Sequence, residues 1–231
     1  MIREALIVAH GQPSDPAPAE AGMERIAGAV GALMPGWQVR AATLAAKGAL
    51  EHALQDLRAP LVFPFFMSDG WFTKVELPRR LAQAGRSGLT TLPAFGRMAA
   101  ADGLAIAAAR TATIGRGWKV EETVLVLAAH GSGRSRAPSE AAGATAAAIR
   151  AALPFRDVRL GFIEEEPSLQ GAATDAGEQA MCLPLFVARW GHVVTDIPEA
   201  LRAAAFRGPC LAPLGTRPEV PAIIAAALAG G

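Results

Sequence analysis

The chain has 231 residues, of which 52% are hydrophobic, and its formal net charge at pH 7 is +1. This length is enough for one or two domains with an apolar core, whereas a charge this small gives no general attraction to nucleic acid or to an anionic membrane. No apolar stretch reaches the roughly 20 residues that cross a bilayer, so we expect neither a membrane nor a nucleic acid as partner.

The first half of the chain alternates short apolar runs with segments of helical periodicity. The apolar runs predict strands at residues 5–9, 39–43, 61–66 and 89–92. Between and after them, helices are expected at residues 19–33, 48–57, 75–84 and 98–113. The glycine-containing segment 114–119 is expected to lead into a second lobe.

The second half repeats this order. Strands are expected at residues 124–129, 158–163, 181–187 and 210–214, and helices at 139–153, 197–205 and 220–228. Because strands alternate with helices, each half is expected to form a parallel sheet flanked by helices. The sequence therefore predicts an α/β protein of two tandem-repeat lobes, residues 1–115 and 120–231, with a cleft between them.

The repeat is also visible residue by residue. His10 and Gly11 follow one apolar run, and His130 and Gly131 follow another, 120 positions later. The same spacing relates several prolines and aromatic residues, including Pro64 and Pro184, Phe66 and Phe186, and Pro93 and Pro213. A single period that links so many positions indicates two copies of one unit.

The two cysteines and the first residues of the chain indicate in which cellular compartment the protein is expected. Cys182 lies in an apolar run and Cys210 in a turn, without CxxC spacing or a disulfide framework. Free core or loop thiols are typical of a reducing compartment. Because the first residues run directly into a strand, we also expect no signal peptide, and the sequence predicts a cytoplasmic protein.

Polar residues follow the strands of the second copy. His130 ends the first strand, Glu164 to Glu166 follow the second, and His192 follows the third. Ligands bind at the carboxyl ends of strands in open parallel sheets, so two imidazoles and at least one carboxylate are expected at one site. Such a set suits Fe, Co, Ni or Zn. The first copy keeps only His10, because Phe72 stands at the third position.

Three segments of the second copy resemble the class II tetrapyrrole chelatases, in particular the sirohydrochlorin cobaltochelatase (CbiX-type) family of cobalamin biosynthesis. They are residues 129–132 (AHGS), 161–169 (GFIEEEPSL) and 183–198 (LPLFVARWGHVVTDIP). The resemblance implies an enzyme, a lyase that inserts a divalent metal, Co²⁺ first and Fe²⁺ or Ni²⁺ as alternatives, into sirohydrochlorin or a related tetrapyrrole without ATP. It also implies that His130 and His192 are the catalytic residues and metal ligands, with Glu164 as the acid.

Other residues are candidates for binding the macrocycle. Guanidinium groups pair well with carboxylates, so we expect this role for Arg134, Arg136 and Arg189, although solvated turn arginines are equally compatible with the pattern. Trp190 and Phe72 would supply apolar walls. Glu165 and Glu166 are alternatives to Glu164 or parts of a hydrated loop. His10 is left open, and His52 is expected at the surface of an outer helix.

Functions other than insertion of cobalt are also compared with the sequence pattern. The same candidate residues would also serve a ferrochelatase for sirohaem, or a non-catalytic carrier of a tetrapyrrole or a metal. A histidine phosphatase would need an arginine immediately before its histidine, where this chain has Ala9 and Ala129. No glycine-rich phosphate loop is present in the sequence, so nucleotide use is not expected. A monomer or a small homo-oligomer is expected.

Overall fold

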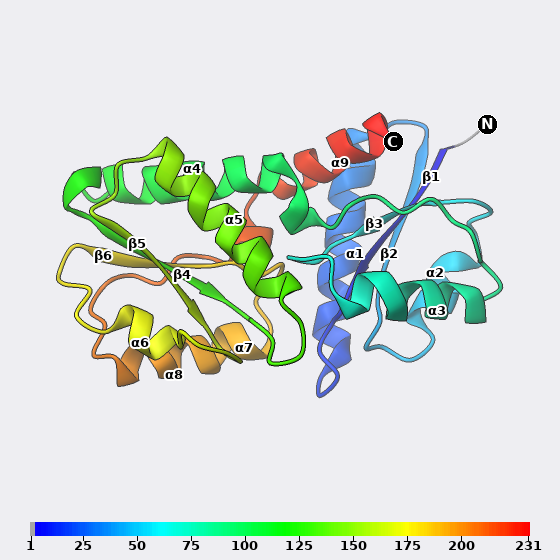
Figure 1. Ribbon diagram of the computed structural model, residues 1–231. Helices are drawn as coiled ribbons and strands as arrows, with labels where there is room; N and C mark the ends of the chain where they lie inside the picture. The colour runs from blue at the N-terminus through cyan, green and yellow to red at the C-terminus, as the bar shows by residue number, and fades with distance from the viewer. Residues whose placement is uncertain (1–2) are drawn as a thin grey trace. The chain divides into compact units, whose positions relative to one another are not determined.

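The computed structural model describes residues 3–231, which form two compact α/β units (Figure 1). The first unit combines Met1–Arg97 with Pro218–Gly231, and the second is Met98–Arg217. Each contains a three-stranded parallel sheet, with strand orders β2-β1-β3 and β5-β4-β6. The predicted fold class, two α/β repeats with parallel sheets, is confirmed.

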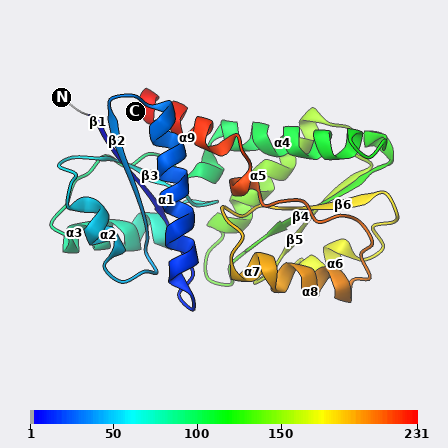
Figure 2. The ribbon, with the colours of Figure 1, turned by 180° about the vertical axis from the view of Figure 1, so that it is seen from behind.

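In the first unit the central strand is β1 (Arg3–Ala9), paired with β2 (Trp37–Thr43) and β3 (Leu61–Pro64). Residues 5–9 are fully buried, because helices cover both faces of the sheet, as is usual for parallel strands. Helices α1 (Pro16–Leu33) and α9 (Val220–Gly230) lie on one face, and α2 (Ala49–Leu54) and α3 (Leu77–Gln83) lie on the other (Figures 1 and 2).

The second unit repeats this arrangement around β4 (Val124–Ala129), which is buried along its whole length between β5 (Asp157–Phe162) and β6 (Ala180–Pro184). Helices α4 (Ala99–Ile114) and α5 (Ala137–Ala152) cover one face (Figure 1). The other face is covered by α6 (Leu169–Ala173) and α8 (Asp196–Ala203), and the one-turn helix α7 (Gly191–Val194) leads into α8.

The packing divides the chain differently from the sequence repeat. Helix α4 follows the first copy in sequence but packs on α5 in the second unit, where Thr145 Oγ1 bonds Asp102 Oδ1 at 2.7 Å. Helix α9 follows the second copy but packs on α1 in the first unit, in both views of the ribbon (Figures 1 and 2). Each unit is therefore completed by the helix that follows the other copy, rather than by residues 1–115 or 120–231 alone.

The prediction of a fourth strand in each lobe is wrong. Residues 89–92 and 210–214 make only single bridges, Val62 with Thr91 and Cys182 with Cys210. Pro93 and Pro213 follow these bridges, and proline lacks the N–H group that a ladder needs. The short helices α6 and α7 were not expected, because one or two turns give too little periodicity to detect.

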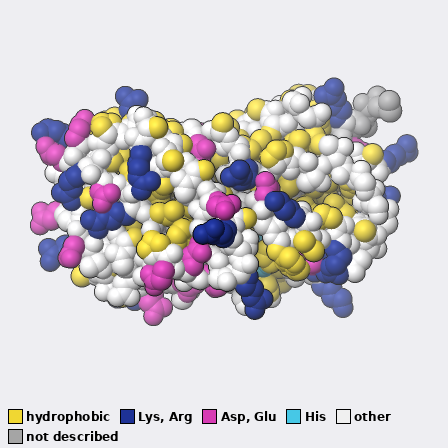
Figure 3. Space-filling view, viewed as in Figure 1, with side chains coloured by type: hydrophobic (Ala, Val, Ile, Leu, Met, Phe, Trp, Pro, Cys, Tyr) yellow, Lys and Arg dark blue, Asp and Glu magenta, His cyan; other side chains and the backbone are white. Residues whose placement is uncertain are grey.

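The surface agrees with a charge near zero. On the face shown in Figure 3, positive and negative side chains are interspersed over both units. Apolar side chains gather over the segment that leads into α3, where Trp71 and Val75 are exposed. Within residues 3–231, every helix is too short or too polar to cross a membrane.

One buried carboxylate fixes the start of α3. Glu76, at the end of the π-helical turn η1 (Phe72–Glu76), accepts hydrogen bonds from Arg79 Nε and Nη2 at 2.9 and 2.7 Å. It also accepts one from Arg80 Nε at 2.9 Å, and Arg80 in turn donates to the carbonyl of Leu44 at 3.3 Å. The bonds from Arg79 and Arg80 lower the pKa of Glu76 from 4.5 to about 2.

We expect Glu76→Gln to lower the free energy of unfolding at pH 7 by about 1.5–3 kcal/mol, the range for hydrogen bonds to a charged group. Since the pKa of Glu76 is lower in the folded chain, its stabilisation is complete above about pH 4.5 and is lost as the pH falls toward 2. Urea unfolding at several pH values measures this difference. The exposed Glu24→Gln is the control, and a difference that is independent of pH would refute the account.

Candidate active site

The central strand of the second unit delivers the first histidine. His130 follows Ala129 directly, so it is exposed at the carboxyl end of β4. Its carbonyl accepts the N–H groups of Ile163 at 3.2 Å and Glu164 at 2.9 Å, which continues the ladder with β5 beyond the strand. Gly131 then turns with a positive φ of 72°, a conformation that favours glycine. The carbonyl of His130 is thereby fixed to the segment that follows β5.

The second histidine comes from α7. The carbonyl of Trp190 accepts the N–H of Val193 at 2.8 Å, and Val193 is buried in the core under α8. This anchoring places His192 beside His130, with their Nε2 atoms 3.2 Å apart and their rings nearly perpendicular at 89°. The structure brings together the two histidines that the sequence placed at one site.

Hydrogen bonds on the far side of each ring determine where the protons lie. His130 Nδ1 lies 2.9 Å from the carbonyl oxygen of Gly131, and His192 Nδ1 bonds the carboxylate of Asp196. A carbonyl and an ionised carboxylate only accept hydrogen bonds, so we expect each Nδ1 to carry the proton. A neutral imidazole protonated on Nδ1 has a lone pair on Nε2. In that tautomer both Nε2 atoms, 3.2 Å apart, are acceptors, and a proton or a cation can bind between them.

Asp196 was missed by the sequence reasoning. It lies four residues after His192, one helical turn along, and is half-buried at the start of α8. The signal was present as the spacing of residues 192–196 (HVVTD), since residues four apart share one face of a helix. The predicted helix begins at residue 197, after the acid, and therefore does not pair Asp196 with His192.

The three glutamates have different surroundings. Glu164 is exposed and its backbone is bonded to His130. Glu165 packs against the turn, because a Cβ on Gly131 would lie 2.7 Å from its Cγ, and its Oε1 is buried without a hydrogen-bond partner. Glu166 accepts the N–H of Ser168 at 2.7 Å. Within residues 3–231, no three His, Cys, Asp or Glu side chains are arranged to hold a metal ion, so the expected third ligand, Glu164, is not assembled with the two histidines.

The predicted macrocycle-binding residues lie in both units. Arg134 and Arg136 are exposed in the turn between β4 and α5, and Arg189 is exposed shortly before α7. Trp190 is half-buried at the N-cap of α7. Phe72 belongs to the first unit, where it contacts His10.

The first unit holds a related but altered arrangement. His10 Nδ1 lies 2.9 Å from the carbonyl of Gly11, as at His130, but its ring packs edge-on against Phe72 at 4.2 Å between centroids. Phe72 also contacts Trp71 and stacks on Phe66. A phenyl ring offers no lone pair, so Phe72 cannot bind a proton or a metal ion together with His10. His52, as expected, is exposed on α2.

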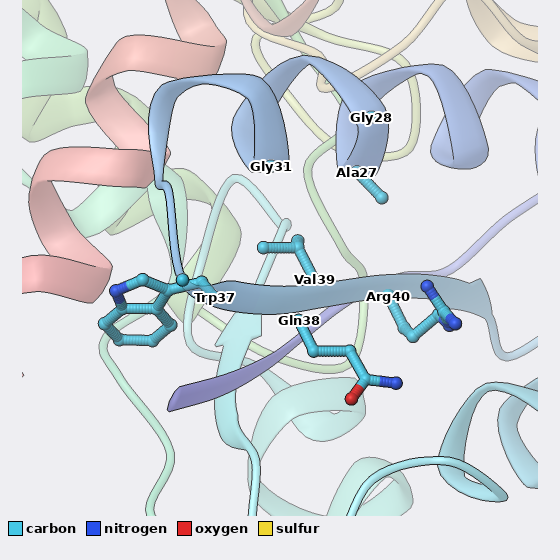
Figure 4. A pocket seen from close by; sticks show the side chains of 8 residues that line it. Ala27, Gly28, Gly31, Trp37, Gln38, Val39 and Arg40 are labelled. Carbon is cyan, nitrogen blue, oxygen red and sulfur yellow. The ribbon is translucent and has the colours of Figure 1, made fainter. Parts of the chain in front are cut away.

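A shallow groove of about 430 Å³ lies between α1 and β2 of the first unit. Figure 4 shows Val39 pointing toward α1, whereas Gln38 and Arg40 point away from it. The groove includes Trp37, at the beginning of β2, while His10 follows the opposite end of its neighbour β1. His10 does not line the groove, and we place the candidate site at His130 and His192.

The chain is similar to a family model and to several solved structures. The CbiX family model matches residues 124–230. A solved structure described as CbiX, the terminal enzyme for biosynthesis of siroheme in denitrifying bacteria, is 47% identical over 99% of both chains, with a TM-score of 0.92. No curated protein matches the chain.

Two further structures share the fold at lower identity. SirB from Bacillus subtilis with Fe³⁺ has a TM-score of 0.78 at 16% identity, over 99% of this chain and 95% of SirB. A multi-domain protein of Deinococcus radiodurans, described as similar in structure to chelatases, has a TM-score of 0.74 at 23% identity, over 99% of this chain and 55% of its own.

We expect Asp196→Ala to release the His192 ring, because Nδ1–H then loses its acceptor. Long-range ¹⁵N–¹H NMR spectra of the imidazoles report the tautomer. The wild-type chain should show Nδ1–H at both histidines when they are neutral, whereas the variant should populate Nε2–H at His192 alone. Glu199→Ala, an exposed position on the same helix, is the control. An unchanged His192 tautomer in Asp196→Ala would contradict the assignment.

Proposed function

Because the chain belongs to the CbiX family of class II chelatases, we propose that it is an enzyme that inserts a divalent metal ion into sirohydrochlorin without ATP, with His130 and His192 as its catalytic residues. The family that the three sequence motifs indicated is thereby confirmed. The observation that carries the proposal is the pair of Nε2 atoms 3.2 Å apart, with an acceptor beside each Nδ1.

The reaction combines two events, removal of protons from the macrocycle and entry of the metal ion. Two pyrrole N–H protons must leave the macrocycle while a partly desolvated cation enters it. A lone pair on imidazole can either bind a metal ion or accept a proton. Two adjacent imidazoles can therefore hold the incoming cation and then take up protons as the cation passes to the ring.

The spacing of the pair suits a metal ion as substrate. Imidazole nitrogens lie about 2.1 Å from a divalent cation, so two of them in neighbouring coordination positions are about 3.0–3.4 Å apart. The observed 3.2 Å falls in this range. With only two protein nitrogens, a bound ion would keep open positions for the pyrrole nitrogens. The exposed edge of the pair supports approach of a large, flat substrate.

Iron is the metal that we propose first. The relative with 47% identity is described as the terminal enzyme of siroheme biosynthesis, which favours Fe²⁺ over the Co²⁺ that the sequence motifs suggested. Cobalt for cobalamin biosynthesis is the second candidate, because nitrogen sites bind both ions and selection between them depends on geometry and supply.

The remaining roles follow the sequence interpretation. We propose that Glu164 carries protons away from the pair, and that Arg134, Arg136 and Arg189 bind the carboxylates of the macrocycle. Trp190 and Phe72 would contact its apolar faces. A cytoplasmic location, and action as a monomer or a small homo-oligomer, belong to the same proposal.

The proposal predicts unequal effects of the histidines. His130→Ala and His192→Ala should each lower metal insertion more than 100-fold, since either change leaves a single lone pair, whereas His10→Ala should change it less than about threefold. The measurement is the change in the visible spectrum of sirohydrochlorin with Fe²⁺ or Co²⁺ under anaerobic conditions. Equal losses in His10→Ala and His130→Ala would overturn the assignment to the second unit.

The same assay distinguishes the three glutamates from one another and an enzyme from a carrier. Glu164→Gln should slow insertion, and Glu166→Gln, which alters only the bond to Ser168, is its control. A larger loss in Glu165→Gln would move the role to the glutamate that packs on Gly131. A carrier would bind sirohydrochlorin and metal without catalysing more than one turnover per chain.

A further inference from the structure

The two cysteines of the chain lie opposite each other in the second unit. The N–H of Cys182 in β6 donates to the carbonyl of Pro209 at 2.9 Å, and the N–H of Leu211 donates to the carbonyl of Cys182 at 2.8 Å. These bonds flank Cys210 and make it the bridge partner of Cys182. The sequence, in which the two cysteines are far apart, gave no reason to pair them.

The backbone at this bridge suits a disulfide. Neighbouring strands lie about 4.8 Å apart, and directly opposite residues of a parallel pair direct their side chains to the same face. Disulfides connect residues whose Cα atoms are about 4.4–6.8 Å apart. The two thiols are free, so the bridge presents a reduced pair in a position to be joined.

The two thiols differ in access and acidity. Cys182 is fully buried, whereas Cys210 is exposed. A hydrogen bond from the Cys182 thiol lowers the pKa of Cys210, and the Arg189 guanidinium lowers it further. The pKa of Cys182 is raised by its interaction with Cys210 and by burial. Since the thiolate is the reactive form, Cys210 is suited to react first and Cys182 to follow.

The buried member of the pair belongs to the core that supports the candidate site. Cys182 belongs to the apolar core that also contains Val193 of α7 and Ile197 of α8. These residues adjoin His192 and Asp196 in the sequence. A covalent change at the bridge would therefore occur in the core on which the second histidine is anchored.

We propose that Cys182 and Cys210 are a redox modification site, which hydrogen peroxide converts into a reversible disulfide. The Cys210 thiolate attacks one peroxide oxygen, the O–O bond breaks and hydroxide leaves, so sulfur is oxidised to sulfenic acid while peroxide is reduced. The Cys182 sulfur then attacks the Cys210 sulfur, the S–O bond breaks, and the hydroxyl leaves with the Cys182 proton as water. Two thiols and one peroxide give one disulfide and two waters, and a dithiol reverses the reaction.

The test uses the full-length reduced protein, treated with hydrogen peroxide, unfolded, alkylated and analysed by mass spectrometry. The proposal predicts loss of both alkylatable thiols, a mass lower by two hydrogens, a linked Cys182–Cys210 peptide, and full recovery with dithiothreitol. In Cys182→Ser, the sulfenic acid should persist at Cys210 and react with dimedone. In Cys210→Ser, Cys182 should resist the same peroxide treatment.

Other outcomes would overturn the proposal. They are two thiols that both remain alkylatable, a disulfide between two chains, or over-oxidised Cys210 beside an unmodified Cys182. Circular dichroism of both serine variants checks that each is folded, and the exposed position of Cys210 makes Cys210→Ser the milder change. The test needs neither metal nor tetrapyrrole, so its result is independent of the proposed function.

Discussion

The proposed site depends on two imidazole nitrogens that the fold holds side by side, His130 Nε2 and His192 Nε2. The carbonyl of Gly131 and the carboxylate of Asp196 are the acceptors that we expect to keep the protons of His130 and His192 on Nδ1. Their Nε2 atoms, 3.2 Å apart, then have no proton of their own to share. In that tautomer both nitrogens can bind a proton or a cation, as the proposed exchange of protons and a metal ion with a macrocycle requires.

The two units differ at the positions that the proposed chemistry uses. The first unit keeps the strand, the positive-φ glycine and the bond from His10 to a backbone carbonyl. It has Phe72 in place of the second imidazole, and Glu76, the counterpart of Asp196, is bound by Arg79 and Arg80 instead of a histidine. The same acid position thus stabilises a helix start in one unit and orients a histidine in the other.

Much of this architecture could be predicted from the sequence. The buried part of β1 and the whole of β4 are continuous apolar runs that end at a histidine. The carboxyl ends of both strands, the bounds of β4 and the meeting of His130 with His192 therefore followed from pattern, whereas the polar first residues of β1 did not. Contacts between distant segments could not be predicted. The exchange of α4 and α9 between units, the bridge between Cys182 and Cys210, and the bond from Asp196 to His192 depend on tertiary packing or on a helix boundary that periodicity locates only approximately.

The most direct test of the paired lone pairs is a double-mutant cycle for metal binding without the tetrapyrrole. Co²⁺ binding is titrated by visible absorption for the wild-type chain, His130→Ala, His192→Ala and the double variant. If the two rings hold one ion, each single variant will weaken binding nearly as much as the double variant does. If the two losses instead add independently, the imidazoles do not share a ligand, and the account of the site is wrong.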